Sequence, residues 1–171
     1  YTKAWTGHMI SRYALVSSRI RQELEDLEAV CDRAERALAA AKQNQADYDF
    51  YIDSAALSLH DWYSGLEKVM SFIASRLEEN MPQGKDWHRE LLHQMQLEIP
   101  EVRPAVFSKT TVSRLDEYLR FRHVLRNVYS FNLQSDRIEA LVSELRITFE
   151  SVRTDLEAFA EFLRQMTDLD S

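Results

Sequence analysis

Residues 48–77 read YDFYIDSAALSLHDWYSGLEKVMSFIASRL, and this stretch decides the fold class. Its apolar residues recur in steps of three and four: Tyr48, Ile52, Ala55, Leu59, Trp62, Leu66, Val69, Ile73 and Leu77. That spacing places them on one stripe of an α-helix. The helix is expected to end near Asn80, because Pro82 and Gly84 follow and proline disfavours a helical conformation in the residue before it.

The same spacing occurs on both sides of this stretch. In the N-terminal part it includes Ile10, Tyr13, Ser17, Ile20, Leu24, Leu27, Cys31, Ala34 and Leu38. In the C-terminal part it includes Ile138, Leu141, Leu145, Phe149, Val152, Leu156, Phe159, Leu163 and Met166, after a helix cap at Ser135. Three helices of roughly 30 residues would each be about 45 Å long. Helices of that length often serve an oligomer interface.

Two shorter elements are expected between residues 80 and 135. A short helix is predicted at residues 86–95, and Pro100 and Pro104 keep the segment that follows irregular. Residues 108–111 offer caps for a fourth helix, which is expected to reach about Tyr129. The sequence therefore predicts an all-α protein, an antiparallel up-and-down bundle of about five helices.

Composition supports a single helical domain. The chain has 171 residues, a usual size for one domain, and its 3 Gly and 3 Pro are too few for the turns of a β-rich fold. Residues 1–8 read like a remnant of an expression tag, with Met9 as the expected native start. Residues 9–171 are then expected to form one domain.

Several classes of function lack support in the sequence. The single cysteine, Cys31, excludes an internal disulfide and a cysteine-based zinc site, and it fits a reducing, cytoplasmic location. No apolar run approaches the roughly 18 residues that span a bilayer, so no membrane insertion is expected. Phosphate-binding loops and the common hydrolase motifs are absent. His60, His88 and His93 are interpreted as structural, and neither a metal site nor a cofactor is expected.

A basic segment stands out in this acidic protein. The net charge is −7, so any binding of nucleic acid must be local. Residues 118–129 read YLRFRHVLRNVY, with Arg120, Arg122 and Arg126 close together. On a helix, Arg122, Arg126 and Tyr129 share one face, where an anion could dock. The alternative is that these arginines pair with carboxylates of neighbouring helices.

This segment resembles the signature of the HEPN superfamily of small helical ribonucleases, in particular the HepT-like toxins. Their motif is Arg, four residues, His, one residue, Tyr, with a polar residue commonly after the Arg. The register falls on Arg122, His123, Asn127 and Tyr129. The run DWHRELL at residues 86–92, with the Ile-Pro and Arg-Pro pairs at 99–100 and 103–104, also looks like a HepT-like branch. The resemblance covers roughly residues 45–165.

The resemblance implies a bundle that pairs as a homodimer, with the motifs of both chains meeting in a cleft at the interface. It implies cleavage of RNA without a metal, in which the motif His moves protons and Arg122 stabilises the phosphorane charge, while Arg120 and Arg126 contact RNA phosphates. It also implies a partner, a minimal nucleotidyltransferase antitoxin of the MNT type. In some systems that partner adds AMP to the motif Tyr, here Tyr129, and so blocks the cleft.

One position departs from the family pattern. Asn127 stands where the motif has His, and a carboxamide cannot exchange a proton near neutral pH. Either His123 takes over proton transfer, or this copy is weakly active, or the Asn was introduced to make a toxic protein expressible. A register that starts at Arg126 puts Phe131 in the place of His and fits worse.

Three hypotheses remain open. The first is a HEPN-type endoribonuclease toxin, acting on tRNA or mRNA. The second is a catalytically inactive HEPN scaffold that binds RNA or the partner nucleotidyltransferase. The third is a coiled-coil-like structural protein with no site. The first predicts that Arg122→Ala loses RNA cleavage. The second predicts binding without cleavage. The third predicts that Arg122→Ala has no effect in any assay.

Overall fold

The structure, a computed structural model, describes residues 2–127 and 134–169. Those residues form five α-helices, with a short 3-10 turn at Gln45–Asp47 and one π-helical turn at Ala74–Glu78. The helices are α1 (Thr2–Gln43), α2 (Tyr48–Ile73), α3 (Trp87–Gln94), α4 (Lys109–Asn127) and α5 (Ser135–Leu169). No strand occurs in these two ranges, so the predicted all-α class is confirmed.

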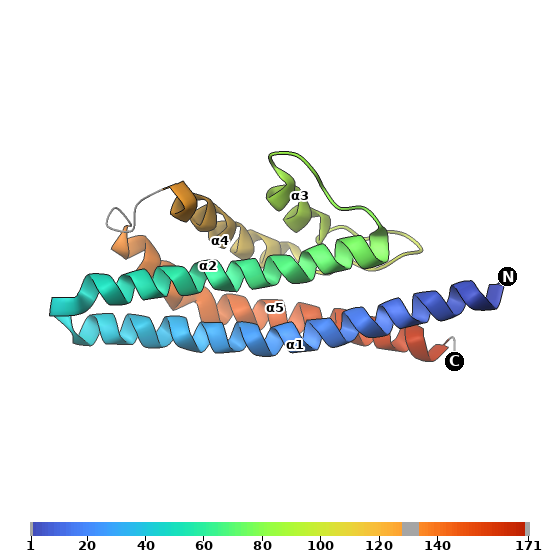
Figure 1. The fold of residues 1–171 in the computed structure, drawn as a ribbon, viewed down its shortest axis with the longest axis horizontal. Coiled ribbons are helices and arrows are strands. Elements are labelled where there is room, and N and C mark those ends of the chain that lie inside the picture. Colours follow the sequence, from blue (N-terminus) through green and yellow to red (C-terminus); the bar gives the residue numbers. More distant parts are fainter. Residues whose placement is uncertain (1, 128–133, 170–171) are drawn as a thin grey trace.

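The three long helices run side by side and carry the two short ones on one flank (Figure 1). Helix α1 packs against both α2 and α5, and it is antiparallel to each of them. Helix α4 lies along α2 and α5, and α3 sits against α2 and α4. The chain is therefore an antiparallel helical bundle, as the sequence predicts.

The predicted apolar stripes form the core. On α2, seven of the predicted positions are buried: Ile52, Ala55, Leu59, Trp62, Leu66, Val69 and Ile73. The stripes of α1 and α5 are buried in the same way, from Ile20 to Leu38 and from Ile138 to Leu163. The burial of these stripes explains the bundle, since each long helix hides its apolar face only by packing on the neighbouring helices.

The ends of the helices agree with the sequence in most places. The π-helical turn ends at Glu78, and Glu79 takes a left-handed conformation with φ 52°, which turns the chain away near the predicted end at Asn80. Ser108 caps α4 by accepting a hydrogen bond from the Thr111 backbone N–H at 3.2 Å. Helix α1 begins at Thr2, earlier than the apolar stripe indicates, because no proline interrupts residues 2–9. The predicted end of α4 at Tyr129 lies outside the described residues.

Cys31 lies fully inside the core, on α1. Burial raises the pKa of its thiol from 9.0 to about 12. We expect a thiol reagent at pH 8 to react only as fast as the chain opens, because the thiolate is the reactive form. Stopped-flow labelling would measure this, with the guanidinium-unfolded chain, which should label at once, as the control. Rapid labelling of the folded protein would contradict the prediction.

The same pKa shift fixes the sign of one pH effect on stability. The folded chain keeps a thiol proton that the unfolded chain releases above its ordinary pKa of 9.0. The contribution of the Cys31 thiol to the free energy of unfolding is therefore complete below pH 9, and it is lost as the pH rises towards about 12.

Among the described residues, no helix has both the length and the apolar character needed to cross a lipid bilayer.

Candidate functional site

Arg122 of α4 is held by a buried carboxylate of α2. Its Nη1 donates to both carboxylate oxygens of Glu67, each at 3.1 Å. The Glu67 side chain is only 8% exposed and the Arg122 side chain 13%, so water screens this ion pair weakly. The carboxylate therefore fixes the guanidinium in one position at the α2–α4 contact.

His88, at the start of α3, joins the same pair. Its Nδ1 lies 2.6 Å from Glu67 Oε2 and 3.0 Å from Arg122 Nη1. The ring of Trp87 stacks on the His88 ring, with centroids 3.6 Å apart. Three helices thus contribute one residue each to a cluster of a carboxylate, an imidazole and a guanidinium, which we call the Glu67–His88–Arg122 cluster.

The contact with Glu67 assigns a proton to Nδ1 of His88. A carboxylate oxygen only accepts hydrogen bonds, so a separation of 2.6 Å requires a proton on Nδ1. The Nδ1–H then donates to Glu67, and the Arg122 guanidinium donates to the same carboxylate rather than to the imidazole. Nε2 remains as the nitrogen that a bound molecule can use.

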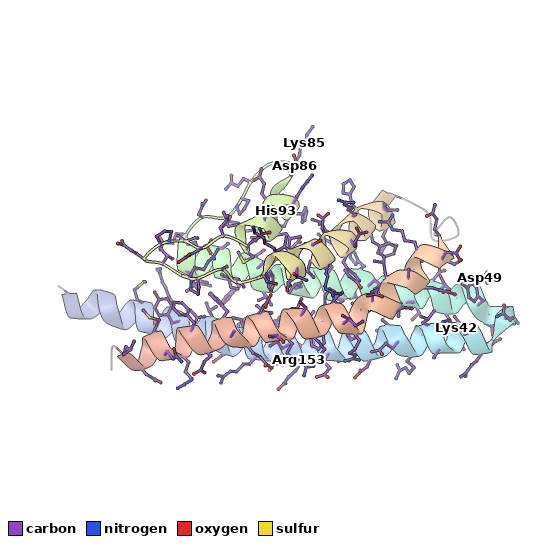
Figure 2. All side chains as sticks on the ribbon, turned by 180° about the vertical axis from the view of Figure 1, so that it is seen from behind. Lys42, Asp49, Lys85, Asp86, His93 and Arg153 are labelled. Carbon is purple, nitrogen blue, oxygen red and sulfur yellow. The ribbon has the colours of Figure 1, made fainter. Side chains whose placement is uncertain are left out.

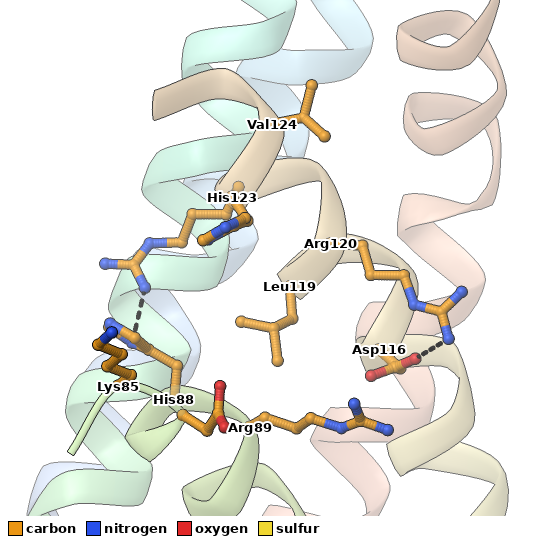
Figure 3. A pocket seen from close by; sticks show the side chains of 10 residues that line it. Lys85, His88, Arg89, Asp116, Leu119, Arg120, His123 and Val124 are labelled. Carbon is orange, nitrogen blue, oxygen red and sulfur yellow. Dashed lines mark hydrogen bonds and ion pairs between the residues drawn. The ribbon is translucent and has the colours of Figure 1, made fainter. Parts of the chain in front are cut away.

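A cavity of about 400 Å³ opens beside the cluster, between α3 and α4 (Figure 3). Leu119 points into its middle, and charged side chains surround it. The positively charged ones are Lys85, Arg89, Arg120 and Arg122, and the negatively charged ones are Asp86 and Asp116. Cations outnumber carboxylates here although the whole chain is acidic, so the cavity suits an anionic ligand.

The cations of the cavity are held to different degrees. Arg120 pairs with Asp116 one turn away, at 2.7 Å, and remains exposed. Among the described residues, Lys85 and Arg89 have no ion-pair partner. Lys85 and Asp86 project outward at the tip of the segment before α3 (Figure 2). The outer rim therefore has positive charges that no ion pair with a described residue neutralises, and these charges are available to a ligand.

Arg122 also borders a second cavity, of about 420 Å³, on the α2 side. Ser64, Lys68 and Ser71 line it from α2, together with Glu67 and Trp87. Tyr63, one turn before Glu67 on α2, is fully buried, and its hydroxyl has no hydrogen-bond partner among the described residues. Burial raises the pKa of Tyr63, and the Glu67 carboxylate adds to this effect, so the phenol stays neutral.

The residues predicted from the motif are placed as follows. Arg122, His123 and Arg120 all line the first cavity, with His123 exposed. Asn127 is the last residue of α4. The side chains of Asn127 and Arg126, and the whole of Tyr129, lie outside the described part of the chain, so their predicted roles remain predictions.

The sequence alone missed two members of the cluster. His88 was interpreted as structural, and Glu67 was not singled out; the structure brings both to Arg122. One signal was present, since Glu67 follows Leu66 on the apolar side of α2, where a carboxylate needs a partner. The alternative of a pairing with a neighbouring helix is thus confirmed for Arg122, within a cluster that borders a cavity.

Comparison with known proteins identifies a family. The family model described as HepT-like protein matches residues 54–163, which include Glu67, His88 and all of α4. No curated protein and no solved structure matches the chain.

Proposed function

Because the chain belongs to the HepT-like family of HEPN proteins, we propose that it is an endoribonuclease toxin that cleaves RNA without a metal ion. The Glu67–His88–Arg122 cluster carries this proposal. It holds a guanidinium and an imidazole at the wall of a cavity whose rim has further cations. That combination serves phosphodiester cleavage, which needs a positive charge at the phosphate and a group that moves protons.

The proposed roles combine the placement of Arg120, Arg122 and His123 at the cavity with the family motif, which supplies the roles of the other residues. Arg122 stabilises the negative charge that develops on the phosphorane oxygens. Arg120 and Arg126 bind neighbouring phosphates of the RNA, and His123, exposed in the cavity, assists proton transfer. Asn127, in the usual place of the motif His, donates a hydrogen bond, and Tyr129 lines the cleft.

The proposal includes an assembly and a partner. The active cleft forms between two copies of the chain in the cytoplasm, acting on tRNA or mRNA. A nucleotidyltransferase antitoxin of the MNT type neutralises the toxin by transferring AMP from ATP to the Tyr129 hydroxyl, with release of pyrophosphate. Mass spectrometry of the chain co-expressed with such a partner would identify the modified residue.

Two observations favour a second candidate function. Asn127 cannot supply the proton transfer of the motif His, and Glu67 neutralises part of the charge of Arg122. A catalytically inactive scaffold with the same fold would bind RNA or the nucleotidyltransferase without cleaving RNA.

Cleavage of total RNA and tRNA in EDTA separates these candidates. Arg122→Ala is expected to lower the cleavage rate by about 10²–10³-fold, the usual loss when a group that stabilises developing charge is removed. Arg164→Ala, an exposed arginine on α5, is the matched control and should cleave like the parent chain.

An Asn127→His variant completes the experiment. Cleavage by the parent chain and not by Arg122→Ala supports the nuclease. Cleavage by Asn127→His alone favours the inactive scaffold, as does binding of RNA by a parent chain that never cleaves it. Equal cleavage by the parent chain and Arg122→Ala would rule out the proposed site.

A further inference from the structure

The proposed reaction needs a group that accepts a proton, and the motif position does not provide one. Asn127 is a carboxamide, which neither gains nor loses a proton near neutral pH. His123 lines the cavity, but it is exposed. The Glu67–His88–Arg122 cluster contains another imidazole, His88, which contacts a buried carboxylate.

Glu67 and Trp87 orient the His88 ring, and Arg122 lies beside it. Nδ1 is 2.6 Å from the buried Glu67 carboxylate, Arg122 Nη1 is 3.0 Å away, and Trp87 stacks on the face of the ring. A carboxylate that accepts Nδ1–H fixes the tautomer and stabilises the imidazolium that forms when Nε2 takes up a proton. The His88 side chain is 23% exposed and lines the cavity, so a substrate can reach it.

We propose, on the basis of the proposed nuclease function, that His88 is the general base of this protein and that Glu67 positions it. Nε2 takes the proton of a ribose 2′-OH, and O2′ forms a bond to the adjacent phosphorus as the bond from phosphorus to O5′ breaks. The products are a 2′,3′-cyclic phosphate and a 5′-OH. O5′ takes its proton from water, and the imidazolium returns its proton to the hydroxide that remains.

Arg122 connects this step to substrate binding. Its guanidinium touches both Glu67 and His88, so a phosphate that Arg122 holds lies close to the imidazole. One cluster thereby combines charge stabilisation at the phosphate with proton transfer from the neighbouring ribose. The chain can then act without a histidine at position 127.

The test compares His88→Ala with His93→Ala, using a tRNA whose cleavage sites by the parent chain have been mapped. His93 lies on the same helix but borders a different cavity, so it is a matched control. We expect His88→Ala to lose about 10²–10⁴-fold in single-turnover rate. Free imidazole should restore part of that rate, whereas it should not restore Arg122→Ala.

The pH dependence of the rate and a second substitution at His88 distinguish a catalytic role from a structural one. The parent rate should fall at low pH, because a general base works only in its unprotonated form, and His88→Ala should lack that acidic limb. His88→Asn, which can still donate a hydrogen bond to Glu67, covers the case in which the alanine variant does not fold. Thermal melting of each variant checks the fold.

The outcomes separate the two proposals. Imidazole rescue together with loss of the acidic limb supports His88 as the base. Cleavage by His88→Ala or His88→Asn at the parent rate overturns this role while leaving the nuclease intact. Loss without rescue and with an unchanged acidic limb also overturns it. Absence of cleavage in the parent chain removes the nuclease function and this inference together.

Discussion

Replacing Arg103 with alanine is expected to lower the free energy of unfolding by about 3–5 kcal/mol, because it leaves a buried carboxylate unpaired. The Arg103 side chain is fully buried and forms an ion pair with Glu78, whose side chain is 3% exposed. The guanidinium also donates to three backbone carbonyls, of Gln94, Leu97 and Pro104, at 2.6–3.0 Å. The Gln94 side-chain amide also donates to Glu78, but it carries no charge that could neutralise the buried carboxylate.

Arg103 fixes the segment that follows α3. Its backbone pairs with Ile99 through two hydrogen bonds of 3.0 Å, and Glu101 between them has a left-handed φ of 67°. The guanidinium ties this turn to the end of α3 and to the π-helical turn that contains Glu78. Loss of Arg103 should therefore also loosen α3, which carries His88.

Chemical unfolding in urea would measure the effect of Arg103→Ala. The control is Arg164→Ala, which removes an exposed arginine with two carboxylate partners and should change stability by no more than about 0.5 kcal/mol. A double variant, Arg103→Met with Glu78→Met, should recover much of the loss, since it leaves no buried charge alone. An Arg103→Ala variant as stable as the parent would show that the ion pair contributes nothing.

Trp62→Ala is expected to destabilise the protein by a similar amount, about 3–5 kcal/mol. Trp62 is fully buried on α2, and its ring centroid lies 5.3 Å from that of Tyr118 on α4. Tyr118 in turn donates a hydrogen bond of 2.7 Å to the Leu141 carbonyl of α5. The indole therefore fills the space where three helices meet, and alanine would leave a cavity there.

The melting temperature reports this loss. For a chain of this size, Trp62→Ala should lower it by about 6–20 °C. Phe50→Ala is the control, because Phe50 lies on the same helix with 72% of its surface exposed and should be close to neutral. Equal melting temperatures for the two variants would mean that the α2–α4 contact is not packed as described.

The local sequence was sufficient to predict the helices. Each long helix carries an apolar stripe with helical spacing, and that stripe is buried. Ser108, at the predicted caps, does bind the first turn of α4, and prolines 100 and 104 lie in the irregular segment before it. These predictions succeed because helix periodicity and capping depend on residues only a few positions apart.

The motif segment was predicted only in part. The basic residues of α4 pointed to the HepT-like family, which the family match confirms. They also pointed to an anion site, which stays a prediction. His88 was interpreted as structural, and its contacts with Glu67 and Arg122 could not be predicted because those residues lie far from it in the sequence. Whether Asn127 and Tyr129 join the site remains a prediction.

By itself, the sequence determined the all-α class, the buried faces of the long helices, the basic segment at residues 120–126 and the family. Only the tertiary structure decided which groups meet at Arg122. In the sequence, Glu67 is 55 positions from Arg122, and His88 is 34 positions from it. The packing of α2, α3 and α4 brings these residues into contact. The physical reason is that a helix fixes its own neighbours through local hydrogen bonds, whereas side chains of different helices are brought together by burial of apolar surface. That burial is non-directional, so the partners of a charged side chain follow from the completed bundle.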